Sequence, residues 1–279
     1  MGAGLLPMFW IAVLLLVACA LVAGFLVVNT GRFRAKVREI ESQLLSTPLP
    51  APAKAEGLPE TVRAVAERAG AGHGGLARAI RLEQQAEMQL GEAKPWQRYA
   101  ARQVIAVGDA GFAWFAWQKP LPILSVLDAF VAGRGWLCAR LVGGIPLVDA
   151  RGDDLNLGEA MRYLAELPWA PDAILANPAI GWLVARDGWL EARLPIAGQT
   201  ALVRLLPDAC GDLVEITATG RPARRPDGST ALMDWRGVFS HHREIGGRRI
   251  PLAGEVGYVE HGDYRPYWRG RITRYELVR

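Results

Sequence analysis

The segment around residue 160 carries the side chains best placed for chemistry. Glu159, Arg162, Tyr163 and Glu166 follow one another at spacings of three, one and three residues. On an α-helix these spacings place all four on one face, because residues three and four apart are neighbours there. Such a face could be catalytic, with Arg162 holding Glu166 as an acid or base at the mouth of a cavity. The alternative is an ion-pair network that docks the helix on a sheet.

Tryptophan is the second chemical feature. Of the ten tryptophans, all but Trp10 lie beyond residue 90, spread over many segments. Ligand pockets are mainly apolar and aromatic, so some of these side chains could line a cavity for an apolar molecule. An arginine beside them could meet an acidic head group. The candidate ligand-binding residues are Trp114, Trp169, Trp182, Trp235, Trp268 and Arg269. The alternative is a large aromatic core for a curved sheet.

Other kinds of site find little support. His241 and His242 are adjacent, and on a strand adjacent side chains point to opposite faces, so they cannot easily share a metal. The sequence contains no nucleophile elbow, phosphate-binding loop or zinc-protease motif. Its 32 basic and 28 acidic residues form no broad basic stripe of the kind a nucleic-acid-binding protein shows. We therefore expect no metal, no cofactor and no nucleic-acid partner, and we favour a non-enzyme over an enzyme.

A long apolar run near the N-terminus determines the setting. Residues 5–28 contain no charged side chain. As a helix of 24 residues the run would be about 36 Å long, enough to cross a hydrocarbon core of about 30 Å. A cleaved signal peptide would have basic residues before a shorter core, whereas here Arg32, Arg34, Lys36 and Arg38 follow the run. We therefore expect a single-pass anchor over residues 1–31.

The remaining chain divides into two further parts. Residues 32–57 are expected to form a basic juxtamembrane helix and then a Pro-rich spacer, Thr47–Ala53. Residues 58–279 are expected to form one β-rich domain. The clearest strand signal there is residues 80–90, in which apolar and charged residues alternate and only Gln84 breaks the apolar face.

The rest of this domain is expected to be mainly β. The segment Gly158–Leu167 is rich in helix formers, and a second short helical turn is expected at residues 172–175. Short strand candidates separated by glycine-rich turns predict a mainly β (α+β) fold: a curved antiparallel meander sheet or partial barrel with one or two short helices packed on it. Those candidates are residues 96–107, 112–118, 123–131, 136–142, 181–185, 189–194, 200–206, 213–219, 235–244, 255–260 and 269–277.

Several of these segments resemble an uncharacterised prokaryotic family, a domain of unknown function found behind an N-terminal membrane helix. The residues that carry the resemblance are Arg162-Tyr163-Leu164-Ala165-Glu166 with Trp169 and Pro171, Gly111-Phe112-Ala113-Trp114, and Tyr267-Trp268-Arg269-Gly270. The resemblance spans most of residues 58–279 and implies no activity.

Three functions remain open from the sequence. The first is a membrane-anchored binding domain that holds a lipid or other apolar ligand in the concave face of the sheet, by analogy with lipoprotein carriers at the level of fold alone. The second is a hydrolase that uses Glu166, Arg162 and Tyr163. The third is a membrane-proximal scaffold for a protein partner, whose identity the sequence does not give.

The basic cluster also predicts an orientation in the membrane. Lys and Arg close to a span tend to stay in the cytoplasm, and all four lie after the run. We therefore expect a single-pass protein of the cytoplasmic membrane with its domain in the cytoplasm. The analogy with lipoprotein carriers favours the opposite, extracytoplasmic side.

Overall fold

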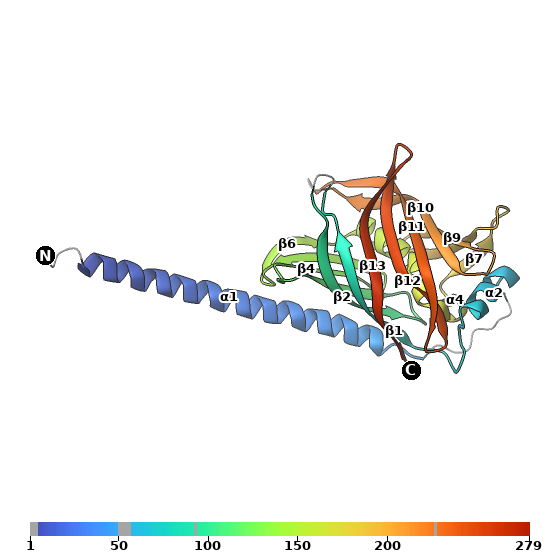
Figure 1. The fold of residues 1–279 in the computed structure, drawn as a ribbon, viewed down its shortest axis with the longest axis horizontal. Helices are drawn as coiled ribbons and strands as arrows, with labels where there is room; N and C mark the ends of the chain where they lie inside the picture. The colour runs from blue at the N-terminus through green and yellow to red at the C-terminus, as the bar shows by residue number, and fades with distance from the viewer. Residues whose placement is uncertain (1–4, 50–56, 92–93, 226–227) are drawn as a thin grey trace.

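The chain is built on one large curled sheet. The computed structural model describes residues 5–49, 57–91, 94–225 and 228–279. Its thirteen antiparallel strands have the order β6-β5-β4-β3-β2-β1-β13-β12-β11-β10-β9-β8-β7. Among the described strands, only the β1–β13 pair joins strands that are distant in sequence. The sheet curls into a half-barrel (Figure 1), which confirms the predicted curved meander.

The strands are β1 (Ala79–Met88), β2 (Gln97–Ala106), β3 (Phe112–Gln118), β4 (Leu124–Val131), β5 (Arg134–Leu141), β6 (Ile145–Ala150), β7 (Gly181–Val184), β8 (Leu190–Ile196), β9 (Gln199–Pro207), β10 (Leu213–Arg224), β11 (Thr230–Ile245), β12 (Arg248–Glu260) and β13 (Asp263–Val278). The helices are α1 (Leu5–Leu45), α2 (Glu60–Arg68), α3 (Asp153–Ala165), the short 3-10 helix η1 (Leu167–Trp169) and α4 (Pro171–Ala176).

Strand β1 shows how the sequence sets the two faces of the sheet. Burial alternates along it in step with the alternation of apolar and charged residues, as a half-buried strand requires. Gln84, which interrupts the apolar face, is nevertheless buried. The sequence does not predict strand β6, because this short edge strand contains Pro146 and most of its side chains are exposed.

The order of the strands forces a helix across the hollow of the half-barrel. The chain leaves the sheet at β6, one edge, and resumes at β7, the opposite edge. Helix α3 makes this crossing and contacts β5 and β4 on one side and β8, β9 and β10 on the other. The helix begins at Asp153, earlier than predicted. Two acidic residues in its first turn stabilise this start, because their negative charges interact favourably with the positive end of the helix dipole. Pro171 begins α4, a common position for proline.

The sheet has an apolar cluster on each face. The larger, inner cluster joins α3, η1 and α4 to the concave face. The smaller, outer cluster joins α1 to the other face of β2–β5. Helix α1 contributes Phe33, Val37, Ile40 and Leu44 to it, spaced four, three and four residues apart as one stripe. The sheet meets this stripe with small side chains such as Ala113 and with the Phe115 ring, whose centroid lies 5.9 Å from that of Phe33.

The first half of α1 has no such partner. It projects from the half-barrel, and the start of α1 lies far from the sheet (Figure 1). The helix is long and apolar enough to cross a membrane, and the most apolar part of its described residues is not buried. Residues 50–53 of the predicted Pro-rich spacer lie outside the described residues.

A buried ion pair ties α4 to the β11–β12 hairpin. Arg248 and Asp172 are both fully buried, with two nitrogen–oxygen distances of 2.8 and 3.0 Å. The remaining guanidinium protons go to the carbonyls of His73 and Gly75, and Asp172 also accepts hydrogen bonds from backbone N–H groups. The pair thus joins three segments that are far apart in sequence.

Asp172→Asn should destabilise the fold by about 3–5 kcal/mol, because it leaves the Arg248 charge buried without a counter-charge. The matched control is Glu215→Gln, which breaks a half-exposed pair with Arg236 and should cost about 0–1 kcal/mol. Denaturant unfolding of the full chain in detergent, followed by tryptophan fluorescence, measures both. Equal losses in the two variants would contradict the role given to the buried pair.

Candidate functional site

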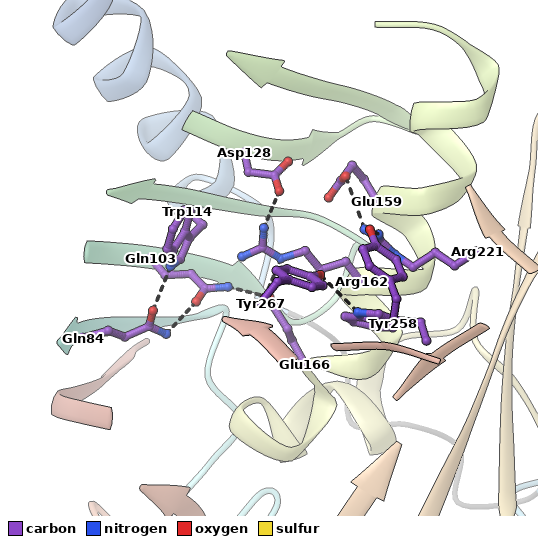
Figure 2. Close-up of polar contacts among 11 residues, drawn as sticks. Gln84, Gln103, Trp114, Asp128, Glu159, Arg162, Glu166, Arg221, Tyr258 and Tyr267 are labelled. Atoms are coloured by element: carbon purple, nitrogen blue, oxygen red, sulfur yellow. Dashed lines mark hydrogen bonds and ion pairs between the residues drawn. The ribbon is translucent and has the colours of Figure 1, made fainter. Parts of the chain in front are cut away.

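The predicted polar face of α3 forms a buried network inside the half-barrel. Arg162 lies between Asp128 of β4 and Glu166, with its Nε 2.9 Å from a Glu166 oxygen (Figure 2). Its guanidinium also stacks 4.7 Å from the Phe112 ring centroid and 5.2 Å from that of Trp114. One arginine therefore joins the helix to two strands of the concave face.

Amide side chains extend the network along the sheet. Gln103 donates to Glu166, and Gln84 donates to Gln103 over 3.0 Å. The Trp114 indole N–H donates to Gln84 over 2.8 Å. Gln84, which breaks the apolar pattern of β1, is therefore part of this hydrogen-bond network.

The contacts described so far form one arm of the network, on strands β1–β6, and a second arm reaches strands β7–β13. We call these two halves of the sheet its wings. Glu159 lies 3.6 Å from Arg221 of β10, and Arg221 donates to the Tyr258 hydroxyl over 3.2 Å (Figure 2). The guanidinium of Arg221 lies over the Trp235 ring at 4.8 Å. Trp235 in turn donates to Tyr267, which stacks on Tyr258. Through its two arms, α3 is fixed to both wings of the half-barrel.

The network holds three carboxyl groups and two guanidinium groups. Burial raises the pKa of Glu159 well above its ordinary value, and the nearby charge of Asp128 raises it further. Burial also raises the pKa of Glu166, against the opposing effect of Arg162. If Glu159 is protonated and neutral, two carboxylates remain in the network to balance the two guanidinium groups. Protonation also lets Glu159 donate to Asp128, since each residue otherwise has a buried oxygen with no partner.

This arrangement places the three catalytic candidates in a closed environment. The side chain of Glu166 is only 7% exposed and that of Arg162 only 18%. Tyr163 is fully buried, where its hydroxyl donates to the Ala106 carbonyl and accepts from Asn177. Each of these groups is engaged with other protein groups, as expected for helix docking. For one of these groups to act as a catalytic acid or base, the structure would need an opening through which a substrate could reach it.

The six predicted ligand residues do not form one group. Trp169 packs edge-on against Phe239 and Trp268, and its indole donates to the Pro251 carbonyl. Trp114 and Trp235 are buried within the two arms of the network. These four tryptophans belong to the inner cluster or pack against it.

Of the other two, Trp182 also packs against the inner cluster, whereas Arg269 lies apart. Trp182 is half-buried on edge strand β7, and its buried indole N–H has no acceptor among the described residues. Arg269 is half-exposed, where it pairs with Glu87 and lies over the Trp96 ring. It therefore does not accompany the buried tryptophans.

A cavity of about 430 Å³ lies elsewhere, at the mouth of the half-barrel. We call it the mouth cavity. It is lined by the end of α1, the β2–β3 loop, the β4–β5 turn with the end of β4, and the end of β8. The lining residues are Gln43, Leu44, Thr47, Ala106, Asp109, Ala110, Gly111, Phe130, Val131, Ala132, Gly133, Leu194, Pro195 and Ile196. None of the six predicted ligand residues is among them. Sequence reasoning missed this site because segments from both wings and a helix end form it.

The lining of the mouth cavity is mostly apolar. Phe130 and Leu194 belong to the inner cluster and Leu44 to the outer one, so the cavity lies where the two clusters meet. Gly111 is needed for close approach, because an added Cβ would lie 2.8 Å from Leu44 Cδ2. The described residues contain no group of His, Cys, Asp and Glu placed to hold a metal.

The chain belongs to a family of unknown function, DUF6544, whose sequence profile matches residues 48–270. This confirms the resemblance to an uncharacterised family. A comparison with curated proteins finds no match.

Solved structures of similar fold include three bacterial proteins. A LolA superfamily protein from Nitrosomonas europaea is 9% identical, with a TM-score of 0.44, over 78% of this chain and 94% of that one. A putative outer membrane lipoprotein-sorting protein domain from Vibrio parahaemolyticus is 8% identical, with a TM-score of 0.42, over 78% and 91%. A DUF1329 family protein from Desulfovibrio piger is 10% identical, with a TM-score of 0.40, over 78% and 94%.

Glu159 should make the stability of the fold depend on pH. Its pKa is raised in the folded state, so the folded chain binds more protons than the unfolded chain above about pH 4.3, the ordinary pKa of glutamate. Its contribution is then lost progressively as the pH rises from there towards the folded-state pKa. Glu159→Gln, which mimics the neutral acid, should flatten this part of the stability curve. Parallel curves for parent and variant between pH 5 and 8, measured by denaturant unfolding, would show that Glu159 is ionised in the fold.

Proposed function

We propose that this member of the DUF6544 family is a membrane-anchored binding domain that holds a lipid or another apolar molecule. The observation that carries the proposal is the mouth cavity. Its volume of about 430 Å³ falls within the range of about 300–1,000 Å³ of pockets that bind small molecules. Its walls are mainly apolar and come from both wings of the sheet and from α1.

The few polar side chains at this cavity restrict the ligand. Gln43, Thr47 and Asp109 supply them, and none is a cation. A ligand with an apolar body and a neutral or cationic end fits this lining better than one with an anionic end. The mouth cavity therefore gives no support to an acidic head group bound by Arg269. The predicted tryptophans would then shape the aromatic core behind the cavity.

The N-terminal half of α1 would hold this domain at a membrane. It is a single helix with the segment that packs on the sheet, so the binding domain and the span would move together. Arg32, Arg34 and Arg38 lie on the α1 segment after the apolar run and are exposed. We therefore propose a single-pass protein of the cytoplasmic membrane with its domain in the cytoplasm.

The orientation has a direct test. In membrane vesicles that have their cytoplasmic face outward, added protease should digest the domain without detergent. In intact spheroplasts the same protease should leave it intact until the membrane is permeabilised. Digestion in intact spheroplasts would place the domain on the outer side and contradict the orientation predicted from the charges.

Filling the mouth cavity should displace the ligand. Thr47→Phe places a ring in the lining, whereas Thr200→Phe places the same ring on an exposed position of β9 outside it. Native mass spectrometry and lipid extraction of the full chain, purified from membranes, should find bound lipid in the parent and in Thr200→Phe. Thr47→Phe should carry several-fold less.

Thr47→Phe also removes a hydrogen bond from the Thr47 hydroxyl to the Leu44 carbonyl, which contributes about 1 kcal/mol. Unfolding curves for both variants therefore accompany the measurement, to show that the fold is kept. A parent chain that carries no apolar molecule, or a folded Thr47→Phe chain with undiminished lipid, would contradict the proposed binding site.

A further inference from the structure

The β5–β6 turn touches α1 at the end of the apolar run. A Cβ added at Gly144 would lie 3.0 Å from Leu26 Cδ2, and one at Gly143 would lie 2.8 Å from Thr30 Oγ1. The Thr30 hydroxyl is also 3.4 Å from the Val142 carbonyl oxygen. The apolar run ends at residue 28, between these two contacts. The β5–β6 turn of the domain therefore contacts α1 directly where the proposed membrane span ends.

This contact is continuous with the rest of the helix docking. Leu26 and Thr30 are half-buried and extend the stripe that continues through Phe33 to Leu44. Such a stripe fixes the direction of α1 relative to the sheet. Figure 1 shows β6 beside the point at which α1 leaves the half-barrel.

Five exposed apolar side chains gather at this end of the domain. They lie on the β3–β4 loop (residues 119–123) and the β5–β6 hairpin (residues 142–147), and we call them the apolar tip. Their exposed fractions are 64% for Leu121, 48% for Ile123, 52% for Val142, 40% for Ile145 and 54% for Leu147. The Val142 N–H donates to the Ile123 carbonyl over 2.6 Å, so the loop and the hairpin present one surface.

Val142 is an unusual residue type for its position in the β5–β6 turn. Val142 has φ 48°, in the left-handed region where a β-branched residue is a strained exception. Glycine or asparagine would relieve this strain. Strain of this kind persists where the surrounding structure enforces it, often at functional sites. The turn thus keeps an exposed apolar side chain at an energetic cost.

Exposed cationic side chains occur on the segments that form the tip or contact it. Lys119 is exposed at the start of the β3–β4 loop, and Arg32 and Arg34 are exposed on α1 just after the apolar run. Basic residues next to an apolar surface are typical of segments that lie in a membrane interface.

We propose that the apolar tip inserts into the interface of the same bilayer that α1 crosses. The domain is then held against the membrane at two points, the span and the tip, and cannot turn freely about the helix. The occupant of this surface is lipid, because the tip directly adjoins the segment expected in the membrane. The inference rests on the proposed membrane span, but it does not depend on ligand binding at the mouth cavity.

Fluorescence quenching in lipid vesicles tests this insertion with the full chain. Cys19→Ala and Cys210→Ser remove the two exposed thiols, and the remaining Cys138 is fully buried. An environment-sensitive fluorophore is then attached at Val142→Cys or Leu147→Cys. The control is Leu183→Cys, on strand β7 at the opposite edge of the sheet and 46% exposed.

Vesicles of phosphatidylethanolamine and phosphatidylglycerol contain a fraction of lipid with a nitroxide near the head group. The nitroxide should quench the fluorophores at positions 142 and 147 several-fold more than the fluorophore at 183. Equal quenching at all three positions would overturn the insertion. Protection of 142 and 147 from both the nitroxide and aqueous iodide would also overturn it, because a protein would then cover the tip.

A label on native Cys19, with Cys210→Ser, separates the failure modes. Quenching of that label by nitroxide in the acyl region, without quenching at the tip, would overturn this inference and leave the proposed span intact. No quenching at Cys19 would refute the span and the insertion together. Lipid binding by the Thr47 variants is measured independently of both.

Discussion

The arrangement of the interior depends on one buried arginine. The strand order obliges the chain to cross the hollow of the half-barrel between β6 and β7, and Arg162 fixes the crossing helix to β4 and to its own C-terminal end. Buried ion pairs recover little net free energy after desolvation, but breaking one is costly. The network therefore serves to select one position for α3. With α3 held there, the inner apolar cluster fills much of the concave face, and a cavity of about 430 Å³ lies at the mouth.

The outer face of the sheet is used in a different way. Where many antiparallel sheets expose this face to water, here β2–β5 carry a second apolar cluster that α1 covers. The helix that would enter the membrane is therefore part of the fold, and its last turn also lines the mouth cavity. The proposed ligand site, the proposed span and the apolar tip all lie along this one helix. The proposed binding would thereby take place next to the membrane surface.

Much of the fold could be predicted from the sequence, because the alternation in β1 and the glycine-rich turns are local signals. The spacing of Glu159, Arg162 and Glu166 likewise predicted a polar helix face, but could not tell a network from a catalytic site. That distinction depends on burial by distant strands. The docking of α1 could not be predicted, because Arg32, Arg34 and Lys36 are interspersed with the buried stripe. The segment therefore has the sequence of a basic juxtamembrane helix. The mouth cavity could not be predicted, since four separate segments form it.

Photo-crosslinking is the most direct test of whether an apolar molecule occupies the mouth cavity. The full chain would be incubated in membranes with a long-chain fatty alcohol that carries a photoactivatable group, then irradiated and digested, and the labelled peptides would be identified by mass spectrometry. Occupation of the cavity predicts labelling of residues 106–111, 130–133 and 194–196, at the β2–β3 loop, the β4–β5 turn and the end of β8, in competition with unlabelled lipid. Labelling confined to residues 9–28 of α1 would show contact with the bilayer alone and would contradict it.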